Sequence, residues 1–258
     1  MKKNRMMRLA SVLLVCVLLT TSVISGTFAK YVTSDSAKDT ARVAKFGVVV
    51  AATGSLYDKN YVDQVSGNIP GSMNLTVVSS NSENLVAPGT QNDTGLTFSI
   101  TGKPEVEVKL EVKLTDADGN DIGNDDDIYL KAKNSLPNMT TGNETDTFDN
   151  LADYYPVVFT LKKGGTQVAQ GKLSDIATYM NGAAMNSASI GANTDLGAEY
   201  GTYTLTWAWD FEDTYDKQDT LLGDLAAGIA LKPDTTLTGT DYNLKSSVKV
   251  SITVTQVD

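Results

Sequence analysis

EVEVKLEVKL, residues 105–114, is the stretch that decides the fold of this chain. Every second residue is valine or leucine, and the residues between them are all glutamate or lysine. A period of two over ten residues gives an extended strand one apolar face and one charged face. Strands of this kind are typical of antiparallel sheets with one buried side. The stretch therefore predicts an antiparallel β-protein in which this strand packs against the core.

Similar alternation recurs along the chain and predicts further strands. The hairpin prediction is specific, because Gly164 and Gly165 separate two apolar stretches and suit a tight turn. In the last stretch, Val248, Val250, Ile252 and Val254 fall on one face and are expected to be buried. The predicted strands are residues 43–51, 73–79, 95–101, 105–114, 128–132, 154–163, 166–172, 203–211 and 247–255.

Two short helices complete the expected elements. Ser174 is a candidate cap for a helix over residues 175–180, and Asp219 is a candidate cap for one over residues 220–231. Three polar or small-residue stretches, 57–72, 134–150 and 183–198, are expected to be loops. This order of elements predicts an all-β fold, an antiparallel β-sandwich of jelly-roll type with one or two short helices.

The N-terminus has the pattern of a secretory signal peptide. Basic residues precede an apolar run of 16 residues (9–24), and Ala29 suits cleavage before Lys30. The run is shorter than the roughly 20 residues that span a bilayer, although an uncleaved anchor stays an alternative. We expect a secreted protein, in the extracellular matrix or at the cell surface, that touches the membrane only through residues 1–29.

Composition excludes several classes of function. The chain has 21 basic and 31 acidic residues, and the leader removes four basic ones, so the mature charge is 17 − 31 = −14. Such a charge disfavours binding to nucleic acid. The chain has no histidine, and its one cysteine, Cys16, lies in the leader. Catalytic triads and histidine- or thiolate-bound zinc are therefore excluded. We expect no enzyme, and a hydrolase that uses only carboxylates is the weaker alternative.

An acidic segment at residues 116–127 allows two interpretations. Oxygen-rich loops suit calcium, and the candidate ligands are Asp116, Asp118, Asn120 and Asp127. The segment departs from the EF-hand pattern, because Asp121 stands where glycine is needed and Asp127 where glutamate is usual. The other interpretation is an acidic turn, since Asp, Asn and Gly favour turns. Apart from calcium, no cofactor is expected.

Trp207 and Trp209 also allow two interpretations. They share one face of a predicted strand with Tyr203, Leu205 and Phe211, which favours burial in the core. The alternative is a surface platform on which a sugar ring stacks, as in a carbohydrate-binding module.

A polar arm, residues 30–42, lies between the predicted cleavage site and the predicted sandwich domain, residues 43–258. Its first nine residues have too little apolar surface to pack firmly in their own subunit. They can serve as a strand donated to another subunit or as a plain flexible leader. The candidate assembly residues are Lys30, Tyr31, Val32, Thr33, Ser34, Asp35, Ser36, Ala37 and Lys38.

The sequence around the cleavage site reads GTFA at 26–29, then Tyr31, DSA at 35–37 and AKF at 44–46. This combination resembles the TasA/camelysin family of exported Gram-positive proteins that form biofilm-matrix fibres. Looser similarity covers LVAPGT (85–90), LTFSITG (96–102) and DTLLGDL (219–225). Some members carry a metalloendopeptidase label, from which this chain departs because it lacks histidine.

The resemblance implies a jelly-roll subunit that polymerises by donating its N-terminal strand to a neighbour. It also implies export through a dedicated signal peptidase, and partners that are further copies of the chain and other matrix or cell-surface proteins. The expected function is therefore that of a secreted structural subunit, or accessory, of an extracellular matrix fibre. The alternative is a surface adhesin or carbohydrate-binding module on the same fold.

Overall fold

A computed structural model of the chain describes residues 10, 12–15, 42–62, 76–131, 136–139, 146–148, 153–211, 215–228 and 240–257. The chain divides into two compact units, Met1–Val43 and Ala44–Asp258. In the first unit, residues 10 and 12–15 are helical. Among all the described residues, no helix is long and apolar enough to cross a membrane. The predicted cleavage site and residues 30–38 lie outside the described residues.

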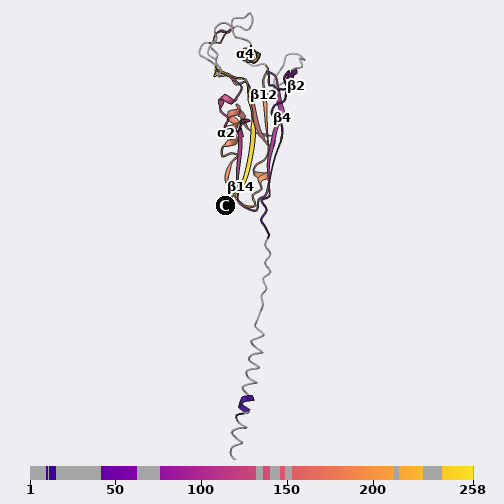
Figure 1. The fold of residues 1–258 in the computed structure, drawn as a ribbon, viewed down its shortest axis with the longest axis vertical. Helices are drawn as coiled ribbons and strands as arrows, with labels where there is room; N and C mark the ends of the chain where they lie inside the picture. The colour runs from indigo at the N-terminus through magenta and orange to yellow at the C-terminus, as the bar shows by residue number, and fades with distance from the viewer. Residues whose placement is uncertain are drawn as a thin grey trace, which may run out of the picture. The chain divides into compact units, whose positions relative to one another are not determined.

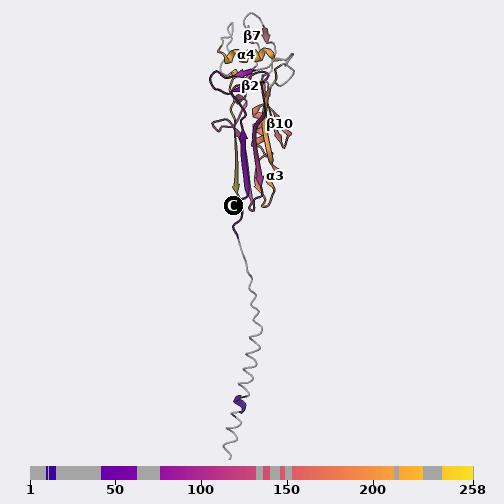
Figure 2. The same ribbon diagram turned by 90° about the vertical axis from the view of Figure 1, so that its right-hand side faces the viewer.

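The second unit consists mainly of antiparallel β-strands, as the alternation predicts. Five of them form a sheet in the order β1-β4-β12-β9-β10, and three form a sheet in the order β11-β5-β14 (Figures 1 and 2). Three smaller ladders pair β13 with β6, β2 with β3, and β7 with β8. The bounds are β1 Val48–Gly54, β2 Asn60–Val62, β3 Thr76–Val78, β4 Gln91–Gly102, β5 Val108–Thr115, β6 Tyr129–Leu130, β7 Leu136–Met139, β8 Asp146–Phe148, β9 Val157–Lys163, β10 Thr166–Gly171, β11 Ser187–Ile190, β12 Gly201–Trp209, β13 Tyr242–Asn243 and β14 Lys249–Gln256.

Short helices cover one end of the five-stranded sheet. Helix α2 (Leu173–Asn181) packs against β9 and β10 and also against β5 of the other sheet (Figure 1). It therefore continues the layer of the three-stranded sheet across the β9–β10 end. The remaining helices are α3 (Leu196–Glu199), α4 (Asp216–Ala226) and the 3-10 helix η2 (Asn124–Asp126).

One hydrophobic core joins the two sheets. Val108, Leu110, Val112 and Leu114 of β5 are at most 1% exposed and belong to the same buried cluster as side chains of β4, β9 and β12. The charged residues between them lie on the solvent face, where Glu111 bridges the flanking lysines at 3.5 and 3.4 Å. The one-sided packing predicted from residues 105–114 is confirmed.

Other predictions of strands are confirmed with shifted ends. The hairpin of β9 and β10 turns at Gly164 and Gly165, which have φ values of +55° and +86°. Strand β12 buries Tyr203, Leu205 and Trp207, as their shared face predicts. The first strand begins at Val48, not at residue 43, because Gly47 adopts a φ of +59° and breaks the extended conformation.

The stretches expected to be loops contain short strands. β2 lies within residues 57–72, β7 and β8 within 134–150, and β11 within 183–198. None of them has more than four residues, so apolar alternation cannot reveal them. Their pairing depends on the neighbouring strand, which a local pattern does not contain.

Both predicted helix caps are wrong. Helix α2 begins at Leu173, so Ser174 lies inside it, and the carboxylate of Asp127 instead accepts hydrogen bonds from Leu173 N at 2.6 Å and Ser174 N at 3.3 Å. Helix α4 begins at Asp216, and Asp219 lies in its first turn. The Asp219 carboxylate is buried, where it accepts hydrogen bonds from the Tyr154 hydroxyl and the Trp209 indole.

A bulge at Gly95 lets three strands approach closely. The register of β4 with β12 shifts next to this residue, where φ is +53°. A Cβ atom at Gly95 would lie 2.0 Å from the carbonyl oxygen of Leu205 on β12. On the other side, a Cβ at Gly54 of β1 would lie 2.4 Å from the Gly95 carbonyl oxygen.

We expect Gly95→Ala to lower the free energy of unfolding by about 2–4 kcal/mol, because it adds a backbone clash to an unfavourable φ. Gly191→Ala is the matched control, since nothing lies within 4 Å of its Cβ and its φ is ordinary. The control should change stability by no more than about 0.5 kcal/mol. Urea denaturation of both variants measures the difference, and equal stabilities would contradict the close approach.

Candidate functional site

The inner face of β1 is uncovered. β1 forms the edge of the five-stranded sheet, and its register places Val50 opposite Ile100 and Ala52 opposite Phe98. Directly paired residues of antiparallel strands point to the same side of the sheet. Ile100 and Phe98 are fully buried, yet Val50 is 45% exposed and Ala52 is exposed as well. The core therefore stops short of the edge that β1 forms.

The inner face of β14 packs against the core but is only partly covered. Val250, Ile252 and Val254 pair with three core residues of β5 that are at most 1% exposed. The β14 side chains are only half-buried. The prediction that these residues are buried is thus confirmed only in part, because they pack against the core without being fully covered.

The two uncovered strands lie on the same side of the unit. Since α2 covers the β9–β10 end of the five-stranded sheet, β14 faces the β1 end, and Figure 2 shows both strands along one edge. Neither strand has a second strand partner among the described residues. We call this opening, bordered by Val48–Gly54 and Lys249–Gln256, the seam. It offers unpaired backbone groups and half-buried apolar side chains together.

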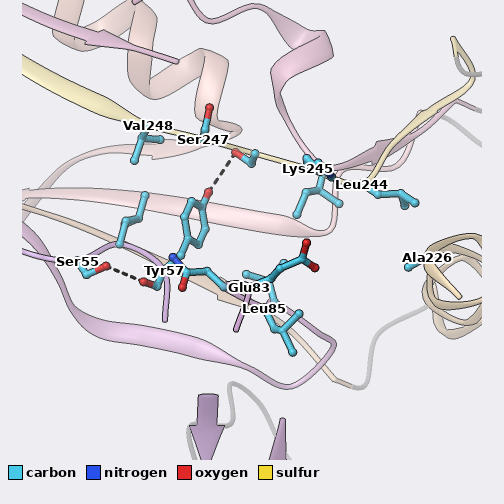
Figure 3. Close-up of a pocket in the computed structure, with 14 residues that line it drawn as sticks. Ser55, Tyr57, Glu83, Leu85, Ala226, Leu244, Lys245, Ser247 and Val248 are labelled. Atoms are coloured by element: carbon cyan, nitrogen blue, oxygen red, sulfur yellow. Dashed lines mark hydrogen bonds between the residues drawn. The ribbon is translucent and has the colours of Figure 1, made fainter. Parts of the chain in front are cut away.

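A cavity of about 800 Å³ adjoins one end of the seam (Figure 3). Residues 55–57 follow β1 directly and residues 244–248 directly precede β14, so the segments that flank both seam strands contribute to its lining. The other lining residues are Glu83, Asn84, Leu85, Val86, Ile128 and Ala226.

Tyr57 forms a polar contact inside this pocket. Its hydroxyl lies 3.1 Å from the Ser246 hydroxyl, which joins the segment after β1 to the segment before β14 (Figure 3). Burial raises the pKa of the Tyr57 phenol far above its ordinary value, and the hydrogen bond to Ser246 offsets this only in part. The phenol therefore stays protonated in the folded protein at physiological pH.

Both tryptophans belong to the core, and Trp207 contacts the pocket-lining residues Leu56 and Tyr57. Trp207 is 2% exposed and Trp209 is 5% exposed, which confirms the prediction that they are buried. The Trp207 indole donates a hydrogen bond to the Leu56 carbonyl oxygen at 2.6 Å, and its ring packs edge-on against Tyr61. A sugar-stacking platform made of these two residues would have to be on the surface, so this form of the carbohydrate-binding interpretation is wrong.

The acidic segment is organised by its own hydrogen bonds. Asp116 accepts bonds from the backbone and side chain of Asn120, while Asp118 is exposed. Asp127 is 2% exposed and caps α2; burial raises the pKa of its carboxyl despite the bonds from Leu173 and Ser174. Within the part of the chain that the structure describes, no three acidic, histidine or cysteine side chains gather as a metal site. Calcium binding by this segment stays a prediction.

Sequence reasoning pointed to the arm and missed the seam. The arm residues from Lys30 to Lys38 lie outside the described residues, so the structure does not relate them to any site. β14 alternates like a core strand, and its sequence gives no sign of exposure. The uninterrupted apolar run VVVAA at 48–52 is the one available signal, because an edge strand usually carries charges. Comparison with known protein families, curated proteins and solved structures finds no match.

Replacing Tyr57 by Phe tests the pocket contact. At neutral pH we expect a loss of about 1 kcal/mol in the free energy of unfolding, because the hydrogen bond to Ser246 is removed. Above pH ~10 the unfolded chain releases the Tyr57 proton while the folded chain retains it, so wild-type stability falls as pH rises. Tyr57→Phe should therefore lose stability less steeply in this range than the wild type.

Ser246→Ala is the control for this measurement. It removes the same hydrogen bond but keeps the buried phenol, so it should lose stability at neutral pH and retain the alkaline fall. Burial raises the pKa of Tyr203 to about 12. The Tyr203 phenol therefore lowers the free energy of unfolding at alkaline pH by the same amount in every variant. Identical alkaline slopes for Tyr57→Phe and the wild type would contradict a buried, protonated Tyr57.

Proposed function

We propose that this chain is a secreted structural subunit, or accessory, of an extracellular matrix fibre, and that copies join by inserting an N-terminal strand into the seam. The observation that carries the proposal is the incompletely covered core along the seam, since Val50 of β1 points inward and is 45% exposed, and Ile252 of β14 points inward and is only partly buried. An added strand would cover these side chains and pair with the free edges.

The chemistry of β1 supports this proposal. Proteins usually protect an exposed sheet edge with lysine, proline or a bulge. β1 reads VVVAATG and has no charged residue and no proline, although six of its seven residues are exposed. An unprotected apolar edge of this length favours strand addition, which makes a pairing partner the simplest explanation for it.

The donor in this proposal is residues 30–38. Their polar composition suits a segment that does not pack in its own subunit, and cleavage after Ala29 would free it. The resemblance to the TasA/camelysin family supports the same assembly, including a jelly-roll arrangement of the two sheets and a dedicated signal peptidase. Further copies of the chain and other matrix or cell-surface proteins are the proposed partners. No observation favours the adhesin alternative, because both tryptophans are buried.

The chain beginning at Lys30 should form filaments that are visible by negative-stain electron microscopy. It contains the whole second unit, which has its own core. Deletion of residues 30–38 should abolish the filaments without changing the free energy of unfolding of the unit. A protein that stays monomeric in sedimentation experiments at high concentration, with and without residues 30–38, would refute the proposal.

Two lysine substitutions on β1 test the seam itself. Val50 points inward with Ile100, whereas Val49 pairs with Thr101 and points to the outer face. Val50→Lys should block filament growth, because an added strand would have to bury the new charge. Val49→Lys should permit growth, since its ammonium group stays in water. Both side chains are exposed, at 45% and 59%, so both variants should fold. Equal growth of the two would show that the seam is not the acceptor.

A further inference from the structure

The pocket beside the seam lies where an inserted strand must leave it. Ser55 continues β1 into the pocket lining, and Val248 leads from the lining into β14. A segment that lies between the two strands therefore passes over the pocket at this end. Its lining is mixed, with leucine and valine side chains beside the Tyr57 and serine hydroxyls, so both polar and apolar chain atoms fit there.

The chain enters the second unit at the opposite end of the seam. The carbonyl oxygens of Lys45 and Gly47 accept hydrogen bonds from Glu105 N and Lys103 N, and β1 then runs toward the pocket. A second copy whose Ala44 end lies over the pocket can pass its preceding residues straight into the seam. If the second copy instead lay beyond the other end of the seam in the same orientation, its own pocket end would be nearest the seam. The residues that precede its Ala44 would then first have to run the length of their own unit. The first arrangement therefore needs the shorter linker.

The length of β1 sets how many residues of an inserted segment fit along the seam. The seven residues of β1 span about 23 Å at roughly 3.3 Å per residue, and residues 31–37 are also seven in number. If residues 31–37 pair along β1, residues 38 and 39 lie over the pocket. The inserted strand runs parallel to β1 and antiparallel to β14, because β1 and β14 run in opposite directions between the pocket and the far end.

The charges of the pocket match this segment. Its two charged lining residues, Glu83 and Lys245, are exposed, and neither forms an ion pair with any other described residue. Lys38 and Asp39 are adjacent residues of opposite charge. In an extended chain, successive side chains point in opposite directions, so each can reach a different wall of the pocket.

We propose that the pocket binds Lys38 and Asp39 of a second copy, with Lys38 at Glu83 and Asp39 at Lys245. This proposal rests on the proposed strand insertion and adds its direction and its register. The seam alone accepts an extended strand in several registers. The two charge pairs favour the one register in which residues 31–37 align with β1, because a shift of one residue reverses which wall each charge faces.

Charge reversal within the chain beginning at Lys30 tests this pairing. Glu83→Lys alone and Lys38→Glu alone should each raise the critical concentration for filament growth about five- to tenfold. The double variant should return it to within about twofold of the wild type. Lys245→Glu and Asp39→Lys should behave in the same way as the second pair. Lys109→Glu, a charge reversal on the outer face of β5, should have an effect of less than about twofold, because this side chain is exposed and does not line the pocket.

Cysteine pairing gives a geometric readout. The chain beginning at Lys30 contains no cysteine, so Asp39→Cys with Lys245→Cys should give a ladder of disulfide-linked oligomers on a non-reducing gel. Asp39→Cys with Lys109→Cys should give none. If filaments require residues 30–38 but single reversals match Lys109→Glu and no ladder forms, the pocket assignment is wrong and strand insertion stands. If the wild type forms no filaments, both proposals fail.

Discussion

The packing of β5 against the five-stranded sheet is the interaction on which the second unit depends. Its inward side chains are fully buried, and it lies between the other two strands of its own sheet. β11 is too short to pair with all of β5. The amide side chains of Asn186 and Asn181 therefore accept hydrogen bonds from Val112 N and Leu114 N at 2.6 and 2.7 Å. The edge of β5 nearest α2 is thus completed within the unit.

On the opposite side of the unit, at the seam, no described side chain is seen to pair with the strand edges in this way. The five-stranded sheet ends at β10 on one side, where threonine and glutamine are exposed and α2 packs nearby, and at β1 on the other, where valine and alanine are exposed. Polar residues at an edge discourage further pairing, and apolar residues favour it. Both sheets are therefore closed toward α2 and open at the seam. This asymmetry gives a subunit one direction in which it can add a strand.

The sequence could predict those features that a local pattern contains. Apolar and polar residues alternate over at least eight residues in β5 and β12, so both strands were predictable. The hairpin of β9 and β10 was predictable because its two adjacent glycines suit a tight turn with positive φ. The cap of α2 was not, because Asp127 lies 46 residues from Leu173 and only the fold brings them together. The incomplete burial of β14 was hidden for the same reason, since its Val-x-Ile-x-Val pattern is that of a fully buried strand. The sequence around the predicted cleavage site indicated the arm as a candidate functional segment. The seam could not be predicted in this way, because it depends on how the two sheets pack.

Electrostatics narrows the ways in which copies of this chain can meet. The chain beginning at Lys30 carries a net charge of 17 − 31 = −14, and like-charged copies repel over a Debye length of about 8 Å at physiological ionic strength. The outer face of β5 presents alternating lysine and glutamate, which keeps water bound and disfavours stacking of sheets. β1 has no charge at all. An approaching strand therefore meets little repulsion and an uncovered apolar surface at the seam, which favours ordered addition there over random aggregation.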